Sequence, residues 1–158
     1  LDPGVLLYLL QSKGMDAKGL EKLLYKESGL LGVSGISQDM RTLLASDRPE
    51  AAEAVDLFCY RIVREVGALA ACIGGLDALV FTGGIGEKAV EIRRRVCARL
   101  GWLGGALDFA GMGLGVAIDE TANEANAVNI GRAGNAADVL VIPTDEEWMI
   151  AEHAQELL

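Results

Sequence analysis

Basic residues and histidine are scarce in this 158-residue sequence, and each scarcity excludes a class of function. Lys and Arg number 14 against 23 Asp and Glu, so the formal net charge is -9. Nucleic acids and anionic membrane surfaces require a basic partner, so neither is expected to bind here. The one histidine, His153, has no second histidine or cysteine near it in the sequence. It is therefore predicted to lie on the surface and not to bind a metal.

Cysteines and long apolar runs are also few. Cys59, Cys72 and Cys97 are scattered through apolar sequence that is predicted to be helical. This odd and dispersed set predicts buried thiols in a reducing, cytoplasmic compartment, and argues against disulfides or a metal framework. The apolar run 66–76 is too short for a transmembrane helix, which takes roughly 20 residues, so no membrane association is expected. The first residue is Leu1 and not Met, which suggests a cut or processed end.

What is abundant points to a globular α/β protein. Apolar residues make up 51% of the chain and aromatic residues only 5%, with 20 glycines. A chain of this length and composition can bury a real core. We therefore expect an α/β fold that is rich in helices and has a small sheet.

Helices are predicted over most of the first half. Asp2 and Asp16 are expected to cap two helices that end near Gly14 and Gly29. Residues 30–37 are predicted to be irregular, and Ser37 is expected to cap a short helix after them. A long helix follows over 49–73, because apolar residues recur there at spacings of three and four. The recurring residues are Val55, Phe58, Ile62, Val66, Leu69 and Ile73.

The second half contains the predicted strands. A continuous apolar run at 78–82 predicts a strand buried on both faces, as in a central parallel sheet. A glycine-rich turn and a helix over 87–100 are expected to follow it. The predicted helix carries three arginines at 93–95, which we expect on its solvent-exposed face. A short strand is predicted around Leu107, and residues 118–134 are interpreted as a surface segment. Residues 138–142 predict a second strand, followed by a helix that Thr144 or Asp145 caps.

The glycines that follow the first strand favour a ligand. Gly83, Gly84 and Gly86 lie at the carboxyl end of the strand, where ligands bind in open α/β sheets. Glycine lets a ligand approach the backbone closely, although a tight turn without a ligand is the alternative. Gly84 and Gly86 with Ala89 also match a dinucleotide-binding pattern, with Asp108 as the acidic partner, so a Rossmann-type domain stays a further alternative.

Four quoted segments resemble one family. They are "LDPGVLLYLL" at the start, "VSGISQDMR" in the middle, "DALVFTGGIGEKAVEIRRRVCARLGWLG" from Asp77 onward, and "VLVIPTDEEWMIA" near the end. Together, and in this order, they are similar to the carboxyl-terminal part of acetate kinases. The resemblance covers nearly the whole chain, so residues 1–158 are interpreted as the carboxyl-terminal nucleotide-binding segment of such an enzyme.

This resemblance implies a fold and a reaction. The family is expected to have a ribonuclease H-like fold, shared with the actin-like ATPases, and to transfer a phosphoryl group reversibly between ATP and acetate with Mg²⁺. The amino-terminal domain and the catalytic residues would precede Leu1, so this segment is expected to contain no catalytic residue and to be inactive alone. Acetate or acetyl phosphate would bind through the absent half, and the complete enzyme is expected to be a homodimer. A propionate or butyrate kinase and a non-catalytic interaction fragment remain alternatives.

The resemblance also assigns roles to individual residues. The "QDMR" segment is similar to one that contacts adenosine, and "GGIGE" to a loop that holds adenine and ribose. The "PTDEE" segment resembles a magnesium element, although its acidic residues could simply stabilise the start of a helix. The residues expected to bind ATP or ADP are Asp39, Met40, Arg41, Gly83, Gly84, Ile85, Gly86, Glu87 and Lys88, and the residue expected to bind Mg²⁺ is Glu146.

Overall fold

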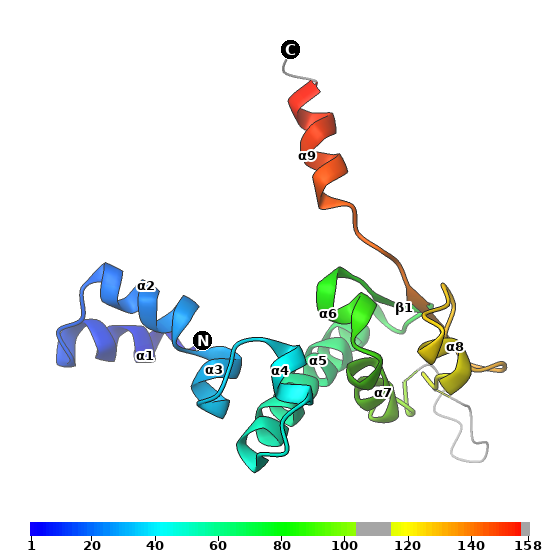
Figure 1. Cartoon of the computed structure of the whole chain (residues 1–158), viewed down its shortest axis with the longest axis horizontal. Helices are drawn as coiled ribbons and strands as arrows, with labels where there is room; N and C mark the ends of the chain where they lie inside the picture. Colours follow the sequence, from blue (N-terminus) through cyan, green and yellow to red (C-terminus); the bar gives the residue numbers. More distant parts are fainter. Residues whose placement is uncertain (104–114, 156–158) are drawn as a thin grey trace. The chain divides into compact units, whose positions relative to one another are not determined.

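The computed structural model describes residues 1–103 and 115–155, without the side chains of Glu146, Glu147, Ile150 and Ala151. The chain forms two compact units, Leu1–Phe58 and Cys59–Leu158 (Figure 1). The predicted strand around Leu107 lies outside the described residues.

The first unit consists of helices. It begins with α1 (Pro3–Leu7), which continues into the π-helical η1 (Tyr8–Ser12), and then α2 (Ala17–Lys26). The side chain of Asp2 accepts a hydrogen bond of 2.7 Å from the backbone N–H of Gly4, and that of Asp16 accepts one of 2.7 Å from Gly19. Both predicted N-caps are therefore confirmed. Each carboxylate satisfies one of the N–H groups that a helix start leaves without a partner.

Two local predictions in this unit are wrong. The stretch after Gly29 was expected to be irregular, but it forms α3 (Gly29–Ser34), which ends at Gly35 with a left-handed φ of 62°. The next helix, α4 (Met40–Leu44), is capped by Asp39 and not by Ser37. Ser37 instead accepts a hydrogen bond from the backbone N–H of Asp39. The carboxylate nearer to the helix therefore takes the capping position.

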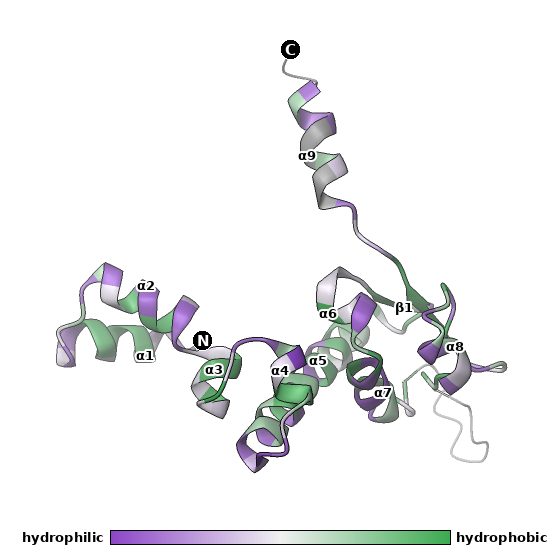
Figure 2. Ribbon diagram, in the orientation of Figure 1, coloured by the Kyte–Doolittle hydropathy of each residue, from purple (hydrophilic) through white to green (hydrophobic). Residues whose placement is uncertain are grey.

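The long helix α5 (Pro49–Ile73) has the predicted bounds. Its first half contributes Val55 and Cys59 to the buried core, together with Ala51 and Ala54. Its second half departs from the predicted stripe, because Leu69 is 62% exposed and Ile73 is 73% exposed. Helix α5 carries both apolar and polar residues (Figure 2), but its last part, 66–73, has no charged side chain.

The second unit contains a small parallel sheet. Strand β1 (Ala78–Phe81) pairs with β2 (Asp138–Val141), and Phe81 lies opposite Val141. This sheet and the surrounding helices confirm the α/β class. Burial of β1 on both faces is not observed, because Val80 is 45% exposed.

The sequence after β1 is helical from its first glycine. Helix α6 (Gly83–Lys88) takes the place of the predicted turn, and α7 (Val90–Ala98) follows it. The two are separated at Ala89, whose ψ of 81° does not belong to a helix. The single helix expected over 87–100 therefore corresponds to the end of α6 and to α7, with a break at Ala89.

Residues 118–134 are more than a surface segment. They include α8 (Glu120–Glu124), and antiparallel bridges join Ile118 to Gly131 and Asn129 to Leu140. Asn123 and Ile130 are fully buried in this part of the chain. Because the segment is mostly polar, its sequence did not indicate that these two side chains are buried.

The last described helix is α9 (Glu146–Gln155), and Asp145 accepts a hydrogen bond of 2.8 Å from the backbone N–H of Trp148. Asp145 is thus the cap, as predicted. His153 is exposed, also as predicted. Cys59 and Cys97 are buried, whereas Cys72 is exposed, contrary to expectation. Within residues 1–103 and 115–155, no helix combines the length and apolarity needed to cross a bilayer.

Candidate functional site

The three glycines of α6 occupy three different environments. Gly83 has a φ of 69°, a backbone conformation that other residues rarely adopt. A Cβ added at Gly86 would lie 3.2 Å from the backbone carbonyl carbon of Phe81. Local structure therefore explains both of these glycines. Gly84 has no positive φ, and a Cβ there would meet no atom within 4 Å, so local structure gives no reason for glycine at this position.

The rest of α6 differs in exposure. Ile85 and Glu87 are half-buried, and Lys88 is exposed. The Glu87 carboxylate accepts hydrogen bonds from Thr144, 2.9 Å from the backbone nitrogen and 3.1 Å from the hydroxyl. The bond from the backbone N–H of Thr144 is the main reason that the pKa of Glu87 lies below its usual value. A carboxylate that was predicted to bind a ligand thus also joins α6 to the start of α9.

Asp39 and Arg41 form a pair in the first unit. The Nη2 atom of Arg41 lies 2.6 Å from Oδ2 of Asp39, and Nε lies 3.1 Å from Oδ1. These bonds, with that from the Arg41 backbone N–H, lower the pKa of Asp39 to about 2. Met40, between them, is buried in the core of this unit with 4% exposure. Asp39 precedes helix α4 as its N-cap, and the side chain of Arg41 folds back onto it.

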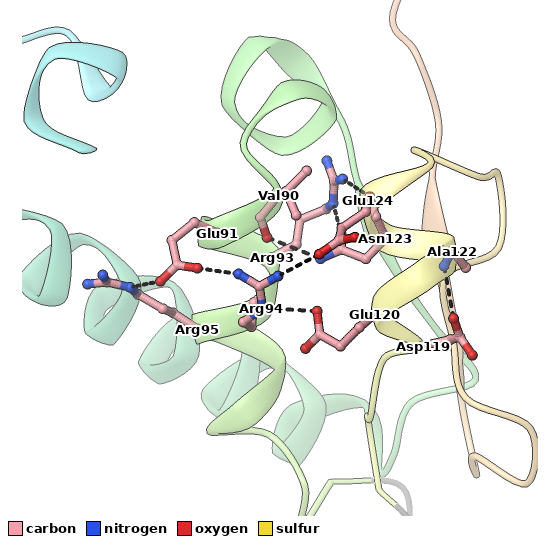
Figure 3. A network of polar contacts seen from close by, with 10 residues as sticks. All are labelled: Val90, Glu91, Arg93, Arg94, Arg95, Asp119, Glu120, Ala122, Asn123 and Glu124. Atoms are coloured by element: carbon pink, nitrogen blue, oxygen red, sulfur yellow. Dashed lines mark hydrogen bonds and ion pairs between the residues drawn. The ribbon is translucent and has the colours of Figure 1, made fainter. Parts of the chain in front are cut away.

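Arg93 contradicts the expectation that residues 93–95 lie on the solvent face, because its side chain is fully buried. Its Nε atom donates to Oδ1 of Asn123 at 2.7 Å, and Nη2 donates to the backbone oxygen of Asn123 at 2.9 Å (Figure 3). Its Nη1 atom donates to the carbonyl oxygens of Gly86 and Glu87, both at 2.8 Å. Burial lowers the pKa of Arg93, but a guanidinium stays charged near neutral pH.

Arg94 and Arg95 are partly exposed and form ion pairs. Arg94 contacts Glu91 within α7 and reaches Glu120 and Glu124 of α8 (Figure 3). Arg95 also contacts Glu91, with Nε 2.7 Å from Oε1. Figure 2 shows both hydrophilic and hydrophobic residues along α7. All three arginines have the same hydropathy, so this property cannot predict that Arg93 is buried while Arg94 and Arg95 are partly exposed.

The predicted metal residue begins the last helix. Glu146 is the first residue of α9, and its side chain lies outside the described residues. Among the side chains that are described, no group of three or more His, Cys, Asp or Glu forms a candidate metal site. Mg²⁺ needs no such group, since it commonly takes one or two carboxylates with phosphate oxygens and water. The hard oxygen donors of the DEE run fit that ion in their chemistry.

Sequence reasoning missed Arg93, Asn123 and Thr144 as determinants of this region. A signal for Arg93 existed, because Val96, Cys97 and Leu100 lie three, four and seven residues after it and are all buried. Arg93 therefore shares their helical face. Asn123 and Thr144 gave no comparable signal, since each meets partners 30 or more residues away.

Comparison with known proteins assigns the family. The model of the acetokinase family matches residues 1–152. An acetate kinase of Rhodopseudomonas palustris is 59% identical over 157 residues, covering 99% of this chain and 37% of that protein. The crystal structure of Porphyromonas gingivalis acetate kinase has 38% identity and a TM-score of 0.77, covering 99% of this chain and 38% of that one.

A propionate kinase of Francisella tularensis is also similar in structure. It has 33% identity and a TM-score of 0.78, covering 96% of this chain and 37% of that one. The chain described here belongs to the acetokinase family. It spans little more than a third of the length of these relatives.

Proposed function

We propose that this chain is the ATP-binding segment of an acetate kinase that transfers a phosphoryl group reversibly between ATP and acetate. The proposal is supported by membership of the acetokinase family and by relatives that are named acetate kinases. In such a reaction, catalysis comes mainly from positioning and from neutralising charge around the transferred group. This segment would supply the positioning of the nucleotide.

The observation that carries the proposal is the open side of Gly84. Gly83 and Gly86 are explained by backbone conformation and by packing, respectively, whereas nothing in the described part of the chain requires glycine at position 84. A nucleotide that lies against the backbone would explain it, because any side chain would separate the two. We propose that residues 83–88 contact adenine and ribose, and that Asp39, Met40 and Arg41 form a second contact with the adenosine.

We propose that Glu146 helps to hold Mg²⁺, either directly or through water. When bound, Mg²⁺ neutralises phosphate charge and orients the phosphate oxygens. The backbone of this chain places Glu146 directly after Thr144 and Asp145, and Thr144 is tied to α6 by Glu87. This bond would thereby hold the residues proposed to bind the metal near those proposed to bind the nucleotide.

The remaining roles belong to the complete protein. We propose that acetate or acetyl phosphate binds through the part that this chain does not span, and that the complete fold is ribonuclease H-like. We also propose that the complete enzyme is a homodimer. The exposed apolar side chains of Leu69, Ile73 and Val80 support further contacts of this segment, with the rest of the protein or with a second subunit.

The second candidate is a propionate kinase, because a propionate kinase is among the similar structures. The test is the kcat/KM of the complete protein that carries this segment, measured with acetate, propionate and butyrate at saturating ATP and Mg²⁺. Acetate is expected to give the highest value. If propionate gave the highest kcat/KM, the protein would be a propionate kinase. The absence of ATP-dependent turnover with all three carboxylates would refute the proposed function.

A Rossmann-type dinucleotide site has less support than a kinase. It depends on Asp108, which lies outside the described residues, and family membership favours the kinase. A non-catalytic interaction fragment is distinguished from both by the turnover of the complete protein with ATP and a short-chain carboxylate.

A further inference from the structure

The buried guanidinium of Arg93 donates hydrogen bonds to backbone carbonyls at the carboxyl ends of two helices. The carbonyls of Gly86 and Glu87 belong to the last turn of α6, and the carbonyl of Asn123 belongs to the last turn of α8. Carbonyls in the last turn of a helix lack partners within that helix. A cation that donates to them also meets the negative end of each helix dipole. Arg93, from α7, therefore joins α6, α7 and α8.

Asn123 completes this connection from the opposite side. Its Oδ1 atom accepts from Nε of Arg93, and its Nδ2 atom donates to the carbonyl oxygen of Val90 at 3.2 Å. Both side chains are fully buried. All four acceptors of Arg93 are neutral oxygens, three of them backbone carbonyls. A buried charge is costly unless it is fully hydrogen-bonded, so this arrangement is sensitive to the loss of either residue.

The place where Arg93 acts is the break between α6 and α7. At Ala89 the backbone leaves the helical conformation, with a ψ of 81°, and the backbone bonds of this one residue to Ile85 and Arg93 link the two helices. Additional bonds are therefore needed to fix the angle between them. The two bonds from Nη1 to Gly86 and Glu87 cross this break. They hold the carboxyl end of α6 against α7 and leave the open side of Gly84 free.

We propose that Arg93 and Asn123 are positioning residues for the nucleotide, and that they act by fixing α6 without touching the ligand. This inference rests on the proposed function, in which α6 contacts adenine and ribose. Loss of the pair would let α6 rotate about Ala89, and ATP would bind more weakly. Acetate, which is proposed to bind elsewhere, would be little affected.

The structure offers a matched control on the same helix. Arg94 also joins α7 to α8, through Glu120 and Glu124, but none of its ion pairs reaches α6. Arg94→Met therefore removes a link between the same two helices without releasing α6. Asn123→Asp keeps an oxygen acceptor for Nε of Arg93 but loses the Nδ2 donor to the carbonyl oxygen of Val90, so a smaller effect than that of Asn123→Leu is expected. Asn123→Leu removes that acceptor.

The experiment uses the complete protein that carries this segment, and it measures KM for ATP and KM for acetate at a temperature well below the melting temperature. Arg93→Met and Asn123→Leu are expected to raise the KM for ATP about tenfold, as for the loss of a hydrogen bond to a charged group. The KM for acetate is expected to change less than about twofold. Arg94→Met is expected to stay near the unsubstituted values.

Hydrogen exchange supplies a readout that does not depend on the nucleotide. Without ATP, amides in residues 83–89 are expected to exchange faster in Arg93→Met than in Arg94→Met. Should Arg93→Met fail to fold, Arg93→Lys decides the same comparison, since an ammonium group keeps the charge but lacks the planar fork.

Two results overturn the inference alone: an unchanged KM for ATP in folded Arg93 variants, or an equal fold rise of both KM values. Absence of ATP-dependent turnover in the unsubstituted protein would overturn the proposed function as well.

Discussion

The carboxylate of Glu87 and the backbone N–H of Thr144 are joined by a hydrogen bond of 2.9 Å across 57 residues of sequence. The hydroxyl of Thr144 donates a second bond to the same oxygen. Together they tie the glycine-rich helix α6 to the residue that comes two positions before Glu146. The two parts of the proposed site that lie in the second unit are therefore linked by one glutamate.

This link predicts a specific pH dependence. The pKa of Glu87 is lower in the folded protein than its usual value, chiefly through the bond from the backbone of Thr144. A depressed pKa contributes stability that is present above the ordinary glutamate pKa of about 4.3 and is lost as the pH falls through the folded-state pKa. In the complete protein, Glu87→Gln should lower the melting temperature near pH 7, and its difference from the unsubstituted protein should shrink in acid. A difference that stays constant from about pH 7 to about pH 3 would contradict this account.

Substitution of Gly84 tests whether this glycine contacts the nucleotide or only serves the local structure. Gly84→Val places a branched side chain in open space, so the melting temperature of the complete protein should change little. The KM for ATP should rise at least about tenfold if the nucleotide lies against this backbone. Steady-state kinetics and thermal unfolding of the same preparation measure both quantities.

Gly86→Ala is the control for this experiment. Its Cβ would lie 3.2 Å from the backbone of Phe81, so the substitution should lower the melting temperature. A large loss of stability in Gly84→Val with an unchanged KM for ATP would mean that α6 is only a structural connection.

Local sequence rules predicted the elements whose causes are local. Asp2, Asp16 and Asp145 cap helices as expected, because a capping carboxylate acts on N–H groups two or three residues away. The spacing of apolar residues likewise predicted the bounds of α5. Ser37 failed as a cap only because Asp39 competes with it two residues later.

The missed features depend on distant partners. Arg93 can be buried because Asn123 and the end of α6 supply acceptors; the apolar residues three, four and seven positions after it indicate the buried face but not these partners. Glu87 was expected to face a nucleotide, and its bond to Thr144 is a further contact that the sequence did not indicate. The candidate site was predicted from a resemblance of motifs, whereas the contacts that hold it in place became visible only in three dimensions.

Glu146 should matter more than Glu147. Adjacent residues on a helix project about 100° apart, so only one of them can face a metal in the site. In the complete protein, Glu146→Gln should cost catalysis about 2–4 kcal/mol, by analogy with the loss of one preorganised electrostatic group. Raising the Mg²⁺ concentration should restore part of the rate, measured as kcat across a Mg²⁺ titration.

Glu147→Gln is the matched control. It should cost only a few tenths of a kcal/mol, as expected for an exposed charge near the start of a helix. Equal effects of the two variants, independent of Mg²⁺, would mean that the acidic run only stabilises the start of α9.

The 158-residue chain alone should not form acetyl phosphate. We propose that the residues that act on the transferred phosphoryl group lie outside this chain, which covers 37% of an acetate kinase relative. Incubation of the purified chain with ATP, Mg²⁺ and acetate should give only the uncatalysed background. Turnover above that background would show that catalytic residues lie within this segment.

Photolabelling of the complete protein with 8-azido-ATP tests the central claim most directly, because the azide reports which residues lie beside adenine. Trypsin releases residues 65–88 as one peptide, which contains β1 and α6, and residues 27–41 as another, which contains Asp39, Met40 and Arg41. We predict that the label is found on one or both of these peptides and is prevented by excess ADP. Labelling that ADP prevents but that lies entirely outside both peptides would contradict the assignment of nucleotide binding to this segment.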